Sequence, residues 1–341
     1  MPELRQNRAT KEWIIIARGR AKRPQEFKSR KKKQKIPKLD PDCPFCPGNE
    51  EKTPSEVFSL KERGSKKWQV RVIPNKYPAL MPEGQLSPQT RGFFLKTRGI
   101  GYHEVIVHTP WHNQTLGNLP LSQVEKVCLT YRQRYLDLQK DRRIKLIIIF
   151  ENHGESAGTS LVHPHSQLVA LPLVPASIRH PLEEAMRYYD DHGSCVFCDM
   201  VKEELGFKRR VVARTKDFIA FHPFASRTPF ETWIVPMKHS AGFGSITKKD
   251  CKEMARILKV MLERLDKRLS DPDYNLLIRT APLKDSEEDY YHWHIQILPR
   301  LTTPAGFELG SGIFINTIFP EETAALLASR KVRKGKRHKQ Y

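Results

Sequence analysis

Two pairs of cysteines in this sequence are each accompanied, further along the chain, by two histidines. Both pairs have the spacing Cys-x-x-Cys, and the histidines follow at similar intervals. Thiolate and neutral imidazole are the ligands of a tetrahedral structural zinc, and a Cys₂His₂ set closes its coordination shell. The sequence therefore predicts two structural Zn²⁺ ions per chain. The expected ligand sets are Cys43, Cys46, His112 and His163, and Cys195, Cys198, His239 and His292.

The alternative for a Cys-x-x-Cys pair is redox chemistry. Neither pair is expected to open a thioredoxin-like turn from a strand into a helix, and each has Phe before its second cysteine. His108 and His153 are competing imidazoles, but they have no counterpart in the other half of the chain. Whether the second site holds zinc or iron stays open. Cys128 and Cys251 lie in helical patterns and are expected to be ordinary buried residues.

A polar, glycine-bearing loop joins the end of an aliphatic strand, at Phe150, to the segment His163-Pro-His-Ser-Gln167. Such a loop suits close approach of an anion to the backbone. Because side chains alternate along a strand, His163, His165 and Gln167 are expected to point to one side. Metal on His163 would hold this strand rigid. Neutral His165 could then attack an electrophile, and Gln167 could donate an N–H to negative charge developing on phosphorus.

The metal ligands and this segment belong to an internal repeat. In each half a cysteine pair is followed by a strand, a histidine, a helix, a second strand and a His-x-His-x-Gln segment. The two helices are expected to begin with capping boxes at Ser122-x-x-Glu125 and Thr247-x-x-Asp250. The chain is therefore expected to be a tandem duplication of residues 1–175 and 176–329, with a boundary near 175–193 and a basic tail at 330–341.

In the second half, His294 and Gln296 stand where His165 and Gln167 stand in the first. The stretch before them, 281–289, carries four acidic residues and no glycine, which makes a poor cradle for phosphate. They are therefore expected to be relics of the duplication.

The hydrophobic pattern favours an α+β fold, with helices packed on largely antiparallel sheets. Leu121–Lys140 and Lys248–Leu269 have the spacing of amphipathic helices. Short aliphatic or alternating runs predict the strands. In the first half these are Trp13–Ala17, Val70–Ile73, Glu104–Val107, Ile144–Phe150 and Gln167–Leu171. In the second half they are Val211–Arg214, Phe218–Phe221, Glu231–Val235, Tyr274–Arg279 and His294–Leu298.

Most of the net charge of +21 belongs to two basic runs, Lys28–Lys38 and Arg330–Tyr341, which hold seven Lys or Arg each and no acid. Without them 45 basic residues face 38 acidic ones. Solvated arms are the expected structure, and a tether to nucleic acid is the alternative. No apolar run is long enough to cross a membrane, and the first residues lack the apolar core of a signal peptide. We therefore expect a cytoplasmic protein.

The chain resembles the galactose-1-phosphate uridylyltransferase family, the transferase branch of the histidine-triad superfamily. Phe150-Glu-Asn152 and His163-Pro-His-Ser-Gln167 match the family's active-site pattern, with Ser166 in place of Gly. Arg20-Ala-Lys-Arg-Pro24 resembles its N-terminal segment, and Val72-Ile-Pro-Asn-Lys-Tyr77 its nucleotide-contacting strand. The resemblance covers nearly everything from about residue 5 to residue 328.

This resemblance implies a double displacement in which His165 carries the nucleotidyl group. A nucleotide sugar would give a nucleoside monophosphate to a hexose 1-phosphate, and Gln167 would favour transfer over hydrolysis. It also implies a homodimer in which Phe307 and Glu308 line the sugar side of the site, either in their own subunit or in the partner subunit. The other substrate-binding residues that it implies are Arg20, Arg23, Asn75, Asn152, Gly158 and Ser160.

Within the family, Ser166, the second cysteine pair and the block 306–312 resemble the ADP-glucose phosphorylase branch, which transfers AMP from ADP-glucose to phosphate. Uridylyl or adenylyl transfer, and sugar phosphate or phosphate as acceptor, therefore stay open. A different class of function is a zinc-stabilised module that binds nucleotides or nucleic acid without catalysis. The intact pair of His165 and Gln167 argues against that class.

Overall fold

A ten-stranded sheet runs through both halves of the chain, in the order β10-β11-β12-β14-β13-β8-β9-β7-β4-β3. The computed structural model describes residues 1–18, 27, 36–62 and 64–328. Every pair of neighbouring strands in this sheet is antiparallel. The α+β class expected from the sequence is confirmed.

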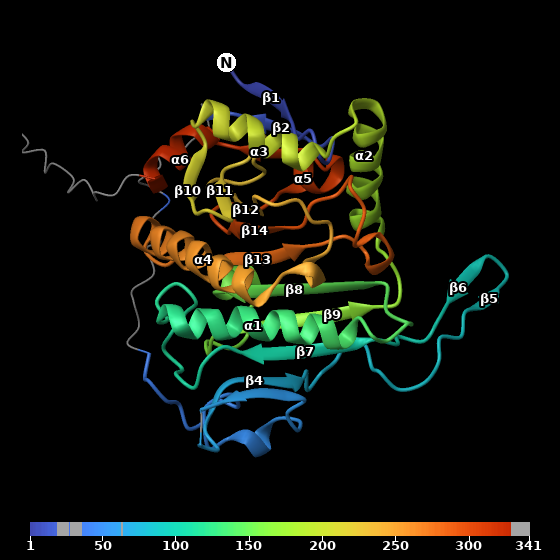
Figure 1. Ribbon diagram of the computed structural model, residues 1–341, viewed down its shortest axis with the longest axis vertical. Coiled ribbons are helices and arrows are strands. Elements are labelled where there is room, and N and C mark those ends of the chain that lie inside the picture. Colours follow the sequence, from blue (N-terminus) through green and yellow to red (C-terminus); the bar gives the residue numbers. More distant parts are fainter. Residues whose placement is uncertain (19–26, 28–35, 63, 329–341) are drawn as a thin grey trace, which may run out of the picture.

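The two halves contribute five strands each, and they meet where β8 pairs with β13 (Figure 1). The strands of the first half are β3 (Phe58–Lys61), β4 (Trp68–Pro74), β7 (Tyr102–Val107), β8 (Leu146–His153) and β9 (His165–Leu171). Those of the second half are β10 (Val211–Arg214), β11 (Phe218–Phe221), β12 (Thr232–Pro236), β13 (Tyr274–Arg279) and β14 (His294–Pro299). Outward from the junction the orders are β8-β9-β7-β4-β3 and β13-β14-β12-β11-β10, so the duplication appears as an approximate two-fold symmetry.

Two long helices, α1 (Leu121–Leu138) and α4 (Lys248–Leu269), lie side by side on one face of this sheet (Figure 1). Their apolar stripes form the main core with the inward residues of the strands, and Cys128 and Cys251 are buried in it. Burial of this apolar surface supplies most of the favourable free energy of folding. On the opposite face, β11 and β12 pack against residues 182–201, and β4 and β7 pack against the segment of Cys43 and Cys46.

The remaining helices lie toward the outside of the second half (Figure 1). They are α2 (Ala176–His192), α3 (Val196–Phe207), α5 (Gly306–Ser311) and α6 (Pro320–Ala328). Short 3₁₀ turns occur in both halves, at Glu50–Lys52, Glu155–Ala157, Phe243–Ser245 and Leu283–Asp285. A small sheet ties the chain's beginning to its end. It contains β1 (Glu3–Gln6), β2 (Trp13–Ile16) and β15 (Phe314–Asn316).

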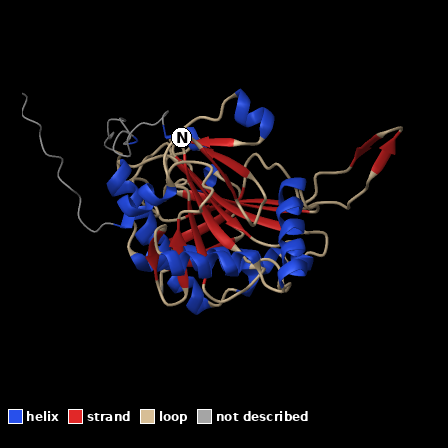
Figure 2. Cartoon of the chain, turned by 90° about the horizontal axis from the view of Figure 1, so that it is seen from above, coloured by secondary structure: helices blue, strands red, loops and turns tan. Residues whose placement is uncertain are grey.

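A hairpin of β5 (Gln89–Arg91) and β6 (Phe94–Lys96) projects away from the body of the protein (Figures 1 and 2). At its tip Phe93, Phe94 and Leu95 are 96%, 78% and 73% exposed. A lone two-stranded hairpin is marginally stable in water at best. This arm therefore carries an apolar surface with no cover from the described part of its own chain.

One expectation about local structure is wrong. Helix α1 has Pro120 at its N-cap and no side-chain cap, so Ser122 lies inside the first turn rather than ahead of it. The region 175–193, where the boundary between the two copies is expected, forms helix α2, which begins after Pro175 and ends at Gly193 in the left-handed conformation. In the sheet, Trp233 faces Gln296 as Val105 faces Gln167, so the counterpart of Glu231 in the first half is His103. The capping box of Thr247 and Asp250 is confirmed.

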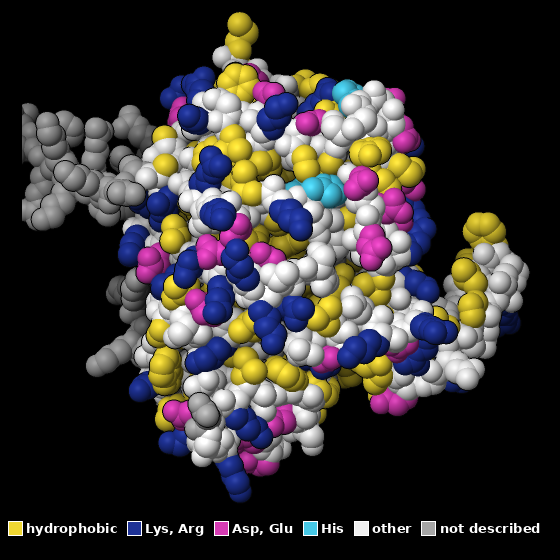
Figure 3. Space-filling model, in the orientation of Figure 1, with side chains coloured by type: hydrophobic (Ala, Val, Ile, Leu, Met, Phe, Trp, Pro, Cys, Tyr) yellow, Lys and Arg dark blue, Asp and Glu magenta, His cyan; other side chains and the backbone are white. Residues whose placement is uncertain are grey.

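Charged side chains on the face that carries α1 and α4 are spread out, with Asp and Glu mixed among Lys and Arg (Figure 3). Most of Lys28–Lys38 and all of Arg330–Tyr341 lie outside the described residues. Among the described residues, the helices include none that is long and apolar enough to cross a membrane.

A buried ion pair joins α1 to β7. Arg134 donates from Nε and Nη2 to the two oxygens of Glu104, at 2.9 and 2.6 Å, and both residues are less than 10% exposed. We expect Arg134→Met to lower the free energy of unfolding by about 3–5 kcal/mol, because it leaves the Glu104 carboxylate buried without its partner. Chemical denaturation measures this change, and the double variant Arg134→Met/Glu104→Met should recover part of the loss. A single variant as stable as the wild type would contradict a structural role for the pair.

Candidate active site and metal centres

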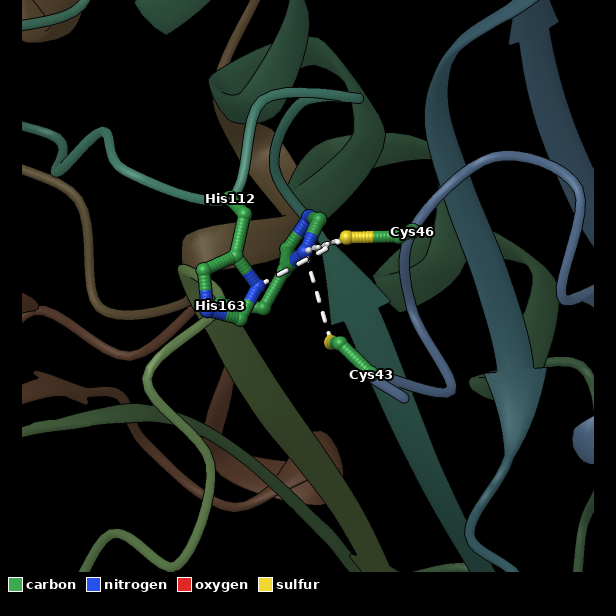
Figure 4. Close-up of side chains that lie close together, drawn as sticks. All are labelled: Cys43, Cys46, His112 and His163. Atoms are coloured by element: carbon green, nitrogen blue, oxygen red, sulfur yellow. Dashed lines mark hydrogen bonds between the residues drawn. The ribbon is translucent and has the colours of Figure 1, made fainter. Parts of the chain in front are cut away.

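The first ligand set converges in the structure as the sequence predicts (Figure 4). The loop before β3 brings Cys43 and Cys46, the segment after β7 brings His112, and His163 lies just before β9. All four residues are buried. Nδ1 of His163 lies 3.7 Å from the Cys43 sulfur and 3.6 Å from the Cys46 sulfur, and Nδ1 of His112 lies 3.6 Å from the Cys46 sulfur.

The second set converges in the same way. The Cys198 sulfur lies 3.3 Å from Nδ1 of His239 and 3.4 Å from Nδ1 of His292. Cys195 is the N-cap of α3, so this pair opens a helix. The element before it is the helix α2 and not a strand, because residues 176–192 are helical. The arrangement is therefore still not that of a thioredoxin-like turn.

Both sets fit a tetrahedral metal ion. Zinc with bonds of about 2.3 Å to sulfur and 2.0–2.1 Å to nitrogen separates these ligand atoms by about 3.5–3.6 Å. The sulfur–nitrogen distances of 3.3–3.7 Å match that value. In each set the four ligand atoms lie within 4.8 Å of one another. Nε2 of His163 donates to the carbonyl of Thr109 at 2.8 Å, which leaves Nδ1 free for the metal. The two groups can thus each hold a metal ion.

His165 lies at the start of β9, two residues beyond the ligand His163. Its Nδ1–H donates to the carbonyl oxygen of His163 at 2.8 Å, so the neutral ring presents Nε2 as an unprotonated nitrogen. Burial lowers the pKa of His165 below its usual value, which favours this neutral form. The ring also packs edge-on against Phe45, which stands between Cys43 and Cys46 in the sequence, and the two ring centroids are 5.3 Å apart. The ring is therefore held in a fixed position and is ready to act as a nucleophile.

Gln167 lies on the same side of β9 and is oriented by a residue that the sequence analysis missed. Nδ1 of His103 accepts the N–H of Ala79 at 3.1 Å, so its Nε2 carries the proton and donates to Oε1 of Gln167 at 2.7 Å. With its oxygen occupied, Gln167 presents its NH₂ group as a donor. Asn75 joins this group, with Nδ2 at 3.5 Å from the same oxygen and Oδ1 accepting from Tyr77.

Asn152 lies at the end of β8, where the register places it across from His165. Its Oδ1 accepts from Nδ2 of Asn275 at 2.8 Å, so its own NH₂ group is left to donate toward the loop and the site. Asn275 also donates to the carbonyl of Ala157 at 2.9 Å. A residue of the second half therefore holds the end of β8 and the loop that follows it.

The glycine-bearing loop itself is held by Asp273. One oxygen of this carboxylate accepts from both the backbone N–H, at 2.8 Å, and the hydroxyl of Ser156. Gly154 has φ of +82°, and a Cβ there would lie 2.0 Å from the same carboxylate. Only glycine allows this approach. Gly158, at φ of +89°, makes the following turn next to the Asn152 amide.

Ser166, which stands in place of the Gly of the family pattern, takes part in a buried hydrogen-bond network. Its side chain points away from His165 and toward α1, where its hydroxyl is hydrogen-bonded to Nε2 of His108 at 2.7 Å and to the hydroxyl of Tyr131 at 2.5 Å. His108 is therefore part of this buried network and does not belong to either metal group of the described residues. His153 is bound to Asp271 and is likewise outside both groups.

Among the described residues, no hydrogen bond or ring contact joins His165 to Ser160, Phe307 or Glu308. Ser160 is exposed near the end of the loop. Phe307 and Glu308 lie on the exposed helix α5, where the Glu308 carboxylate accepts the N–H of Ala305. Arg20 and Arg23 lie outside the described residues.

The functional residues that the sequence analysis missed are His103, Asp273 and Asn275. Only His103 had a local signal, since it is a polar residue on the face of β7 that is otherwise formed by Val105 and Val107. Asp273 and Asn275 act on a loop more than 110 positions away, and no local pattern reveals that.

Comparison with known proteins agrees with this geometry. Two family models match, one described as galactose-1-phosphate uridyl transferase, N-terminal domain, over residues 1–175, and the other as its C-terminal domain, over residues 182–312. An ADP-glucose phosphorylase of Arabidopsis thaliana is 36% identical, covering 96% of this chain and 92% of that protein. A galactose-1-phosphate uridylyltransferase of Thermotoga maritima is 32% identical, covering 97% of this chain and 99% of that protein.

Solved structures are similar over the same extent. The crystal structure of an ADP-glucose phosphorylase from Arabidopsis thaliana with bound ADP-glucose superposes with a TM-score of 0.83 at 32% identity, covering 97% of this chain and 99% of that one. A uridylyltransferase structure superposes with a TM-score of 0.74 at 29% identity, covering 96% and 97%. Both the family models and the full-length relatives extend over the catalytic segment and both metal groups. The chain belongs to the galactose-1-phosphate uridylyltransferase family and is a nucleotidyltransferase.

Proposed function

We propose that the chain moves a nucleoside monophosphate from a nucleotide sugar to a hexose 1-phosphate, as a uridylyltransferase does, through a covalent intermediate on His165. One observation carries the proposal: the hydrogen bond from Nδ1 to the His163 carbonyl leaves Nε2 as a fixed, unprotonated nucleophile. The amide of Gln167, turned by His103, stands on the same side of the strand.

The proposed reaction has two displacements at the same phosphorus. In the first, the Nε2 lone pair of His165 forms an N–P bond with the α-phosphorus, and the bond from this phosphorus to the sugar phosphate oxygen breaks. Sugar 1-phosphate leaves with that electron pair. In the second, a phosphate oxygen of the acceptor attacks the same phosphorus and the N–P bond breaks. Donors from Gln167 and Asn152 stabilise the charge that gathers on the phosphoryl oxygens.

A second candidate is transfer of AMP from ADP-glucose to phosphate. It is favoured by the 36% identity to the Arabidopsis ADP-glucose phosphorylase, against 32% to the Thermotoga uridylyltransferase. A panel of UDP- and ADP-sugars, each assayed with hexose 1-phosphates and with inorganic phosphate, separates the two. Fast turnover of UDP-glucose with galactose 1-phosphate supports uridylyl transfer, and fast phosphorolysis of ADP-glucose supports the second candidate.

His165→Gly should abolish transfer, because it removes the attacking nitrogen. The wild type should exchange label between a nucleotide sugar and its sugar 1-phosphate without a second acceptor, and should take up acid-labile label from the nucleotide. The variant should do neither, while its metal content and melting temperature stay near the wild-type values, since the metal ligand His163 is kept. Transfer without exchange in the wild type would indicate a direct displacement. Saturable binding without turnover or label would indicate a non-catalytic module.

We further propose that the bound metal is Zn²⁺ at both sites and that its role is structural. Four protein ligands close the shell of each ion, so no position is open for substrate. Bound there, the ion would hold His163, and with it the start of β9, in place. A cytoplasmic location suits these sites, because thiolate ligands require a reducing compartment.

Metal analysis of the purified protein should therefore find two zinc ions per chain. Cys43→Ser and Cys195→Ser should each lose one ion and lower the melting temperature, because binding of a structural metal is coupled to folding. Cys128→Ser is the matched control, since Cys128 is buried but belongs to neither group. It should keep both ions. One ion or none in the metal-replete wild type contradicts the proposal.

We also propose that the enzyme is a homodimer and that the halves 1–175 and 176–329 divide its work. The first half carries the nucleophile, and the second supports its loop and supplies the exposed helix α5. Phe307 and Glu308 would then line the sugar side of the partner subunit's site. The exposed apolar tip of the β5–β6 hairpin supports the presence of a partner chain, because exposed apolar patches of this kind commonly mark protein–protein interfaces.

Sedimentation velocity tests the dimer. The double variant Phe93→Ser/Phe94→Ser should shift the protein toward the monomer, because it removes apolar area that only a partner can bury. Phe207→Ser, at an exposed position of α3, is the control and should leave the association unchanged. A wild type that is monomeric at micromolar concentration would overturn the proposal.

A further inference from the structure

A small cavity in the second half lies at the place that corresponds to the catalytic site of the first. His294 and Gln296 of β14 form part of its wall, as His165 and Gln167 of β9 do in the active site. The cavity has a volume of about 50 Å³, and Ser177, Ile178 and Pro181 of helix α2 line it from the other side. We call it the second-half cavity.

The catalytic half has Asn152 at a place where the second half has an arginine. Phe150 pairs with Gln167 and Leu277 pairs with Gln296, so Asn152, two residues beyond Phe150, corresponds to Arg279. Arg279 lies directly across from His294 in the register. The side chain that faces a substrate phosphate in the first half is thus replaced by a full positive charge in the second.

Arg279 forms no ion pair with a described carboxylate. Its Nε donates to Oε1 of Gln296 at 2.8 Å. Its pKa is lowered, because burial disfavours the charge and Arg227 repels it, and these effects outweigh Tyr291, Glu12 and Glu231, which favour the charge. Taking such a charge out of water is costly unless an anion compensates it.

The acidic groups around the cavity are already engaged. Glu12 accepts from the guanidinium of Arg227, and Glu231 accepts from the backbone of Arg227 at 2.6 Å and from the indole of Trp233 at 2.8 Å. Because Gln296 gives its oxygen to Arg279, its NH₂ group is left to donate, as that of Gln167 is in the active site. The terminal nitrogens of Arg279 and this amide are therefore donors with no hydrogen-bond partner among the described residues.

We propose that the second-half cavity binds a small tetrahedral oxyanion, with inorganic phosphate as the natural candidate, between the guanidinium of Arg279 and the amide of Gln296. Hydrogen bonds from arginine to phosphate are charge-assisted and suit the fork of its donors. A water needs about 10–15 Å³ of such space, so 50 Å³ has room for about three to five atoms of that size, as in one phosphate. A nucleotide would not fit. This ion is bound apart from the reaction at His165.

Thermal melting in the presence and absence of inorganic phosphate tests the proposal on the full chain. In a buffer without oxyanions, Arg279→Met should be at least as stable as the wild type, because it removes a half-buried charge that has no ion-pair partner among the described residues. Phosphate should raise the melting temperature of the wild type by about 2–4 °C more than that of the variant. Phosphate bound at the active site raises both alike, so the difference reports the second-half cavity.

Arg134→Met is the matched control. It also removes a buried arginine, but one paired with Glu104, so it should lose stability in either buffer and keep the full phosphate increment. An equal increment in the wild type and Arg279→Met would overturn the proposal. Glucose 1-phosphate should give no increment that depends on Arg279, and such an increment would contradict the size of the proposed ligand.

Crystals soaked in tungstate locate the ion directly. Anomalous density within hydrogen-bond distance of Arg279 in the wild type, lost in Arg279→Met, supports the site. Ordered tungstate at His165 with only water at Arg279 contradicts it.

Discussion

The antiparallel pairing of β8 with β13 is the constraint on which the catalytic site depends. It joins two five-stranded halves into one sheet, and it places residues of the second half beside the end of β8. Asn275 thereby reaches Asn152 and Ala157, and Asp273 reaches Ser156. The glycine-bearing loop after β8 is thus held by side chains from the second half. This dependence gives the second half a structural role in the candidate site of the first.

Strand β9 is fixed on both of its faces. On one side the cysteine–histidine group and the Thr109 carbonyl hold His163, and on the other Tyr131 and His108 hold Ser166. His165 lies between these two anchors, and its remaining freedom is taken by the hydrogen bond to the His163 carbonyl. An imidazole placed in this way would lose little entropy on attacking an electrophile, which is one contribution that a protein scaffold makes to a displacement.

The sequence was sufficient for those parts of the site that repeat. The two ligand sets, His165 and Gln167 could be predicted because the same residue types recur at nearly the same intervals, and two copies make chance coincidence improbable. Parts that depend on one copy were missed. Asp273 and Asn275 act across the junction of the halves, where no local pattern records the contact.

Helix α2 was missed for a different reason. Its start after a proline and its end at a glycine are ordinary helix signals, but the boundary between the two copies was expected there. In the sheet register Glu231 corresponds to His103, although nine positions separate His103 from His112 and only eight separate Glu231 from His239. Sequence spacing alone therefore does not establish which residues of the two halves correspond. The pairing of the strands in the sheet is needed as well.

Because the two halves share one sheet, the order in which the ribosome makes the strands affects folding. β8 is complete at His153, whereas its partner strand begins at Tyr274, 121 residues later. At about 5–20 residues per second, a ribosome needs about 6–24 s to make that stretch. During this time β8 is the open edge of a folded half-sheet, and an open edge can pair with any strand that it meets. The nascent first half can therefore pair with that of a neighbouring chain, a risk that lasts until β13 has left the ribosome.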